Sequence, residues 1–84
     1  MTFETRLDAG NVGEAIDHYK KGIREQKSGR HEQAIEYYTV AIELLPTYTL
    51  AYNNRGVAYK SLGEFQKAID DYNAAIDLNP EPQT

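Results

Sequence analysis

Apolar residues recur along most of the chain at intervals of three and four positions, the spacing that places them on one face of an α-helix. Short stretches containing glycine or proline separate four such runs. The pattern therefore predicts four helices and an all-α fold. Allowing a few residues at each end, we expect these helices at 12–28, 31–45, 48–62 and 65–79.

Start and stop signals stand near the ends of these runs. Asn11, with a glutamate three residues later, suits the N-terminal cap of the first helix. Gly29 and Gly63 can adopt the left-handed backbone conformation that ends a helix. Pro46 and Pro80 lack the N–H group that a continuing helix requires. The first and third helices are thus expected to end at glycine and the other two at proline.

The second half of the chain repeats the first. A shift of 34 residues aligns the two halves without an insertion or deletion. The matched residues are small, apolar or aromatic, or proline: Gly22 and Gly56, Gly29 and Gly63, Ala34 and Ala68, Ile35 and Ile69, Tyr38 and Tyr72, Ala41 and Ala75, Ile42 and Ile76, Leu44 and Leu78, and Pro46 and Pro80. Such a period predicts two stacked helical hairpins. We divide the chain into a lead segment, two repeats and a tail, at 1–14, 15–48, 49–82 and 83–84.

One set of residues in the second repeat resembles the signature of the tetratricopeptide repeat family. The set is Ala51-Tyr52-Asn53-Asn54-Arg55-Gly56, Ala58, Tyr59, Gly63, Phe65, Ala68, Tyr72, Ala75 and Pro80. The resemblance covers residues 15–82. It implies antiparallel helical hairpins in a short right-handed α-solenoid that binds another protein, with neither a catalytic activity nor a cofactor.

Tyr52, Tyr59, Phe65 and Tyr72 are expected to pack between the two helices of the second repeat. The chain departs from the family pattern at four positions, where polar residues replace aromatic ones or leucine: His18, Glu25, Lys21 and Arg55. These departures predict looser packing of the first helix pair.

Composition excludes several classes of protein. The net charge of −4 argues against a nucleic-acid-binding protein, which needs clustered lysine and arginine. No apolar run approaches the roughly 20 residues that span a bilayer. Without cysteine the chain has neither disulfides nor a thiolate metal site, which favours a cytoplasmic location. His18 and His31 lack a metal-binding spacing, and a salt link between Glu14 and His18 is the expected role of that pair.

The two ends of the predicted stack differ in polarity. One stripe of the first helix is polar, whereas its counterpart one repeat later is mostly apolar; the stripes are Asp17, Lys21, Arg24 and Ser28, and Ala51, Arg55, Ala58 and Leu62. The N-terminal end is therefore expected to face solvent.

The C-terminal end keeps apolar residues. Ile69, Tyr72 and Ile76 repeat residues that would cover the following helix in the first repeat, and residues 80–84 are too rich in proline to form a capping helix. Self-association, exchange of a helix with a second copy, and a longer repeat array are three open outcomes. A fourth is that residues 1–10, with Phe3 and Leu7 one turn apart, fold back over an apolar surface.

The resemblance also implies a ligand groove, because the first helices of successive repeats line a concave surface in this family. The groove residues combine apolar, amide and ammonium groups: Ile16, Tyr19, Lys20, Ile23, Gln26, Lys27, Leu50, Asn53, Asn54, Val57, Lys60 and Ser61. These groups suit an extended or helical peptide, and the ammonium groups would attract an acidic one. Asn54 matches the clamp by which some members grip chaperone tails, but Tyr19 and Ile23 do not, so that ligand is not expected.

Two functions follow from these observations. The leading one is a protein-interaction module that binds a peptide segment in this groove. The alternative is a structural protein that forms homo-oligomers or swaps a helix through its C-terminal end, with Ile69, Tyr72 and Ile76 at the contact.

Overall fold

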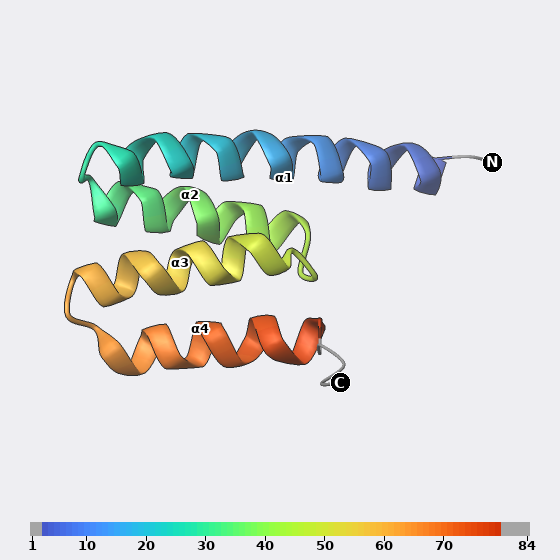
Figure 1. The fold of residues 1–84 in the computed structure, drawn as a ribbon. Helices are drawn as coiled ribbons and strands as arrows, with labels where there is room; N and C mark the ends of the chain where they lie inside the picture. Colours follow the sequence, from blue (N-terminus) through green and yellow to red (C-terminus); the bar gives the residue numbers. More distant parts are fainter. Residues whose placement is uncertain (1–2, 80–84) are drawn as a thin grey trace.

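Four α-helices form one antiparallel stack in chain order (Figure 1). The computed structural model describes the backbone of residues 3–79 and the side chains of residues 11–79. The helices are α1 (Phe3–Lys27), α2 (His31–Leu44), α3 (Thr49–Ser61) and α4 (Phe65–Leu78). Within the described residues there is no strand. The predicted all-α fold of four main helices is confirmed.

The first helix begins earlier than predicted. α1 starts at Phe3, so Asn11 lies inside the helix and is not its cap. The segment before Asn11 contains no proline, and a single glycine inside a helix costs only about 1 kcal/mol relative to alanine, so nothing there stops the helix. The backbone of residues 3–10 continues straight beyond the end of α2 and does not fold back across the stack (Figure 1). The side chains of Phe3 and Leu7 are outside the described part.

The two hairpin turns share one geometry. Gly29 and Gly63 have φ angles of 82° and 81°, in the left-handed region, which confirms the predicted glycine stops. The N–H of the residue after each glycine bonds the carbonyl five residues earlier, at 2.9 Å in both turns. Pro46 follows the end of α2 at Leu44, as predicted. Pro80 and the tail lie outside the described residues.

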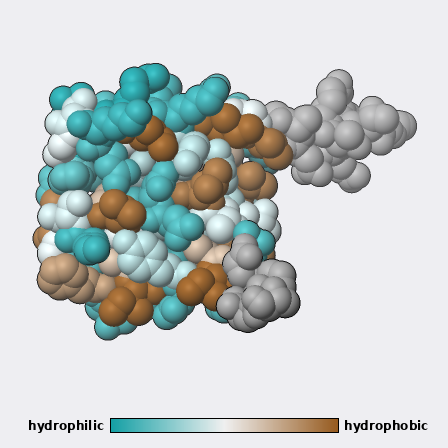
Figure 2. Space-filling model, in the orientation of Figure 1, coloured by the Kyte–Doolittle hydropathy of each residue, from teal (hydrophilic) through white to brown (hydrophobic). Residues whose placement is uncertain are grey.

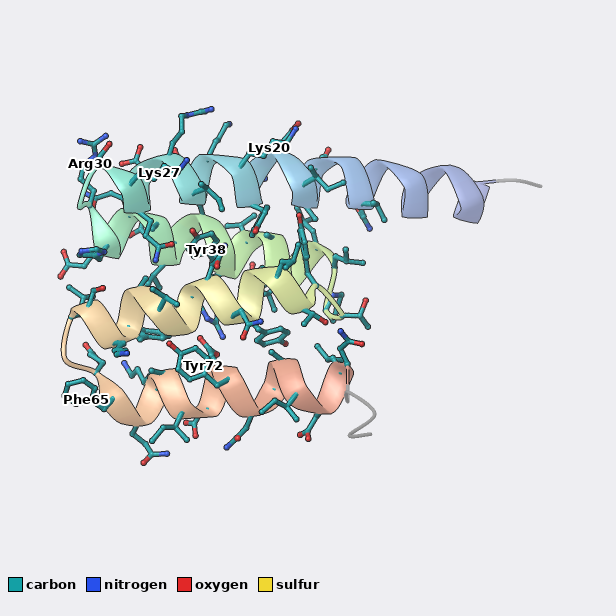
Figure 3. All side chains as sticks on the ribbon, in the orientation of Figure 1. Lys20, Lys27, Arg30, Tyr38, Phe65 and Tyr72 are labelled. Carbon is teal, nitrogen blue, oxygen red and sulfur yellow. The ribbon has the colours of Figure 1, made fainter. Side chains whose placement is uncertain are left out.

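A tyrosine ring on a glycine sets the spacing of each hairpin. A Cβ atom added to Gly22 would lie 2.5 Å from the ring of Tyr38, and one added to Gly56 would lie 2.7 Å from the ring of Tyr72. Both distances are too short for any real side chain. The absence of a Cβ therefore lets each ring lie directly on the neighbouring helix (Figure 3).

The core is built mostly of alanine. Apart from Tyr38 and Ile42, the buried apolar residues are all small: Ala15, Ala34, Ala41, Ala51, Ala58, Ala68 and Ala75. Ala15, Ala41, Ile42 and Ala51 form one cluster that joins α1, α2 and α3. Small side chains allow the helices to pack closely, which is what stacking two hairpins requires.

Two expectations about side-chain packing are wrong. Phe65 is 62% exposed, because it is the first residue of α4 and points away from α3 (Figure 3). The first helix pair is not looser than the second, since Ala34 and Tyr38 are fully buried there. The ring of His18 lies 6.2 Å from that of Tyr37, so this polar residue still packs against α2.

Alanine substitution of the glycines tests this contact. Gly22→Ala should lower the free energy of unfolding by about 1–3 kcal/mol, because the fully buried ring of Tyr38 must move. Gly56→Ala should cost less, because Tyr72 is only partly buried and can shift outward. Chemical denaturation followed by circular dichroism measures both values.

Gly13→Ala is the matched control. A Cβ at Gly13 would have no neighbour within 4 Å, so this change should stabilise α1 by about 0.5–1 kcal/mol. Equal effects of the Gly13 and Gly22 substitutions would contradict the proposed role of the tyrosine ring.

Candidate protein-binding surfaces

α1 and α3 contact each other and share one surface of the stack, which we call the α1/α3 face. At its centre the side-chain amide of Asn54 donates a hydrogen bond to the hydroxyl oxygen of Tyr19, at 3.0 Å. The ring of Tyr19 lies 5.9 Å from that of Tyr38 and 5.0 Å from that of Tyr48. Tyr19 and Asn54 therefore hold the two repeats together, in addition to any part in binding.

Tyr38 lies beneath this aromatic group and is fully buried. Its hydroxyl donates to the side-chain carbonyl of Gln26. Burial, reinforced by the neighbouring Tyr19, raises the pKa of Tyr38 to about 12. Gln26 is half-buried and its carbonyl is engaged, so it contributes to the packing of α1 on α2 more than to an open surface.

The remaining predicted groove residues point outward to different extents. Ile16, Leu50 and Val57 are exposed, and Leu50 reaches 56%. Ile23 is half-buried. The polar members Lys20, Lys27, Asn53, Lys60 and Ser61 are all exposed. The α1/α3 face thus carries exposed apolar side chains with amides and ammonium groups along it.

The sequence analysis did not include Val12 among the residues of this surface. It is exposed on α1 and precedes Ile16 by four residues, which places it on the same side of the helix. Its spacing was the available signal, but the lead segment predicted at 1–14 separates it from the first repeat. With Val12 included, the exposed apolar part of the α1/α3 face is longer by one turn.

The two ends of the stack differ as the sequence predicts. Ile42 of α2 is 9% exposed, whereas its counterpart Ile76 on α4 is 60% exposed, and Ile69 is 49% exposed. Tyr72 is partly buried, although its counterpart Tyr38 is fully buried. The difference arises because α3 covers α2, while within the described residues no helix covers the outer side of α4.

The N-terminal end is polar and exposed. All four residues of the polar stripe are exposed, namely Asp17, Lys21, Arg24 and Ser28. Their counterparts Ala51 and Ala58 on α3 are fully buried against α2. The side of α1 that repeats the packing face of α3 is therefore solvated.

A charged pair that the sequence did not reveal joins α3 to α4. The guanidinium of Arg55 makes two hydrogen bonds of 2.8 Å to the carboxylate of Asp71, which is nearly buried. A third hydrogen bond, of 3.0 Å, reaches the hydroxyl of Thr39 on α2. The bonds to Asp71 are the main reason why the pKa of Arg55 is raised. Arg55 thus links three helices.

The first repeat holds different residues at these positions. Lys21 and Tyr37 are the counterparts of Arg55 and Asp71, and the ammonium nitrogen of Lys21 lies 6.0 Å from the centre of the Tyr37 ring. The available signal was that Arg55 interrupts the otherwise apolar stripe of the third helix and that Asp71 stands where the first repeat has a tyrosine.

A pocket of about 200 Å³ lies where the C-terminal part of α4 meets the beginning of α3. Its lining combines apolar and polar side chains: Thr49, Asn53, Ala75, Ile76 and Asn79. Ile76 belongs both to this pocket and to the exposed apolar end of the stack. The pocket therefore opens beside the surface expected to self-associate.

The two histidines do not belong to a metal site within the described residues. No group of three histidine or acidic side chains within residues 11–79 could hold a metal ion. A ring nitrogen of His18 lies 2.9 Å from the backbone carbonyl of Glu14, so the expected salt link to the Glu14 carboxylate is wrong. In the part of the chain that the structure covers, no helix has the length and apolar character of a membrane span.

Two hairpins with matching turns, matching glycine–tyrosine contacts and one shared alanine core define a helical repeat protein. A family model for the tetratricopeptide repeat matches residues 49–82, and a second model for the same repeat matches residues 24–63. The chain belongs to the tetratricopeptide repeat family, with two tandem repeats.

Curated relatives share part of this region. The chain is 41% identical over 58 residues to sperm-associated antigen 1 of Homo sapiens, a match that covers 62% of this chain and 6% of the relative. It is 40% identical over 47 residues to Uncharacterized protein MJ0572 of Methanocaldococcus jannaschii, which covers 56% of this chain and 55% of the relative. The chain thus spans a small part of the first relative and about half of the second.

Removal of the buried charge tests the role of Arg55. Asp71→Ala should lower the free energy of unfolding by about 3 kcal/mol, because the guanidinium loses its carboxylate partner in a largely buried setting. Replacing both partners with Arg55→Met and Asp71→Leu should recover much of this loss. Chemical denaturation measures each variant.

The control is Glu64→Ala, which removes an exposed ion pair with Lys67. Exposed pairs contribute little, so its melting temperature should stay close to that of the unmodified chain. If Asp71→Ala is as mild as Glu64→Ala, the charged pair does not stabilise the hairpin.

Proposed function

We propose that this chain is a protein-interaction module whose α1/α3 face binds a peptide segment of a partner protein. The observation that carries the proposal is the row of exposed apolar side chains on α1 and α3, formed by Val12, Ile16, Leu50 and Val57. Contiguous exposed apolar patches, especially those rimmed by polar residues, mark protein–protein interaction sites. Proteins of the tetratricopeptide repeat family generally bind other proteins, which supports the same role.

Polar groups beside this row favour an acidic ligand. Lys20, Lys27 and Lys60 are exposed, and ammonium groups attract carboxylates of a peptide. The exposed amide of Asn53 can bond a peptide backbone group through both its N–H and its carbonyl. A face of two helices is short, so we expect weak binding by this module alone.

The proposed role requires no catalysis and no cofactor. Tetratricopeptide repeat proteins are typically non-enzymatic scaffolds, which supports this part of the proposal. We further propose a cytoplasmic setting and no nucleic-acid ligand, since the net charge of −4 would repel phosphate groups.

A displayed library of random 12-residue peptides tests the proposal. Peptides that combine acidic with apolar residues should be enriched on the purified chain, because they match the α1/α3 face. Lys20→Glu and Val57→Asp should each weaken the selected peptides at least about tenfold, which corresponds to about 1.4 kcal/mol. Fluorescence anisotropy measures the dissociation constants.

Lys67→Glu serves as the control, because Lys67 is an exposed lysine on α4, outside the α1/α3 face. Selected peptides should bind this variant as tightly as the unmodified chain. Equal binding to the Lys20, Val57 and Lys67 variants would show that the α1/α3 face is not the site.

Self-association through α4 is a second candidate function. The observation that favours it is the exposure of Ile69 and Ile76, whose counterparts in the first repeat are covered by α3. Full burial of an exposed isoleucine contributes roughly 1.5–3 kcal/mol, and about half of each side chain is still exposed here, so a second copy gains roughly 1 kcal/mol for each one it covers.

Sedimentation velocity over a wide concentration range tests this function. The weight-average sedimentation coefficient should rise with concentration, and Ile76→Asp should abolish the rise by placing a charge in the contact. Val57→Asp, an equivalent change on the α1/α3 face, should leave it intact. A coefficient that stays constant at high concentration would exclude self-association.

A further inference from the structure

The exposed side of α4 carries a continuous apolar stripe. Phe65, Ile69, Tyr72 and Ile76 follow one another at spacings of three and four residues, which places them on one side of the helix. Phe65, Ile69 and Ile76 are all at least 49% exposed. The edge of the molecule formed by α4 accordingly shows several hydrophobic areas in a row (Figure 2). The stripe begins at the first residue of α4 and ends beside the pocket.

The corresponding place in the first repeat is filled by aromatic side chains. One period earlier, the pocket residues Asn53, Ala75 and Ile76 become Tyr19, Ala41 and Ile42. There Tyr48 and Tyr52 pack against the cluster that contains Ala41 and Ile42. In the first repeat, the surface formed by Ala41 and Ile42 is thus covered by tyrosine rings from the loop after α2 and from α3.

The pocket in the second repeat has room for an aromatic ring. Its volume is about 200 Å³, and an apolar cavity of roughly 150 Å³ holds benzene. Asn53 replaces the larger Tyr19 on one wall, which opens the space further. Ala75 and Ile76 offer apolar walls. Thr49, Asn53 and Asn79 make the rest of the lining polar, so an aromatic side chain from outside fits the pocket by its volume and by contact with Ala75 and Ile76.

A second copy cannot supply that ring by extending the stack head to tail. In such an arrangement its α1 would take the place of α3, with Asp17 and Arg24 where Ala51 and Ala58 are fully buried. A carboxylate and a guanidinium would then lie without partners in positions that accept only a methyl group, which is costly. The α3 of a second copy is already packed on its own α2.

We propose that two copies pair through α4 in an antiparallel, two-fold arrangement, with Phe65 of each copy inserted into the pocket of the other. The inference rests on the proposed self-association and specifies its geometry. In an antiparallel pair the first residue of one α4 lies opposite the last residues of the other. Phe65, at the start of the stripe, is thereby brought to the pocket at its far end.

The arrangement is self-complementary. Phe65 and Ile76 are 11 residues apart, roughly 16 Å along a helix, so one contact forms at each end of the paired helices. The two copies of Ile69 fill the centre between the Phe65 rings, beside Tyr72, whose ring packs on Gly56 of its own α3. Such a contact is isologous and closes at the dimer.

Disulfide trapping tests the geometry directly, because the chain contains no cysteine. A double variant with Glu64→Cys and Asn79→Cys keeps Phe65 and should form a covalent dimer under mild oxidation, seen by non-reducing electrophoresis. The two positions flank α4 and are 15 residues apart, roughly 22 Å along the helix, so they cannot form a bond within one chain.

Two controls separate this dimer from other assemblies. The pair Glu64→Cys and Gln33→Cys, with the second cysteine on the exposed side of α2, should form no covalent dimer. The pair Lys21→Cys and Asn73→Cys reports head-to-tail stacking, because residue 21 of one copy would then take the place of Arg55 beside Thr39. A covalent dimer from that pair would overturn the proposal.

A pocket-filling variant supplies an independent readout. Asn53→Tyr installs the residue found at the corresponding position of the first repeat and should fill the pocket from within. Sedimentation velocity should then show dimerisation at least about tenfold weaker, as it should for Phe65→Ala. Circular dichroism confirms that both variants keep the helical fold.

Failure of this inference is distinguishable from failure of self-association. Suppose that Ile76→Asp abolishes association while Asn53→Tyr has no effect and the double variant with Glu64→Cys and Asn79→Cys does not cross-link. The chains then associate, but Phe65 does not enter the pocket. If the unmodified chain stays monomeric at all concentrations, self-association itself is excluded, and this geometry with it.

Discussion

The contact of a tyrosine ring with the backbone of a glycine is the constraint on which the structure depends. It occurs twice, between Gly22 and Tyr38 and between Gly56 and Tyr72, and it fixes how closely the two helices of each hairpin approach. With that distance set, only small residues fit between neighbouring helices, so the core consists almost entirely of alanine. A core of alanines buries little apolar area per residue. The larger apolar side chains are left for the surfaces, where they are available to partners.

The two hairpins share the glycine–tyrosine contact and the alanine core, but their environments are unequal, so their surfaces differ. α2 is covered on both sides, by α1 and α3, whereas among residues 3–79 only α3 covers α4. The same isoleucine is therefore a core residue at position 42 and an exposed one at position 76. The α1/α3 face does not depend on this asymmetry, because both hairpins contribute to it equally. The chain thus presents two independent apolar surfaces, one proposed for a peptide and one for a second copy.

The sequence predicted the features that recur with the period and missed those that occur once. The glycine turns, the exposed end and the polar stripe of α1 all follow from comparing one repeat with the other. The start of α1 could not be predicted, because Asn11 is a favourable cap while no residue before it forbids a helix. The exposure of Phe65 was missed because an aromatic signature position is expected to be buried. The pair of Arg55 and Asp71 was missed because Lys21 and Tyr37 replace it in the first repeat.

Arg55 reaches α4 through Asp71 and α2 through Thr39, so a single side chain spans the boundary between the hairpins as well as the interior of one. If one hairpin unfolds, Arg55 therefore also loses its hydrogen bond to the other hairpin. In an array held together only by nearest-neighbour contacts, each unit can melt separately. Here the guanidinium of Arg55 couples the unfolding of the first hairpin to that of the second. The chain is therefore expected to unfold in one cooperative step, although it is built of two repeats.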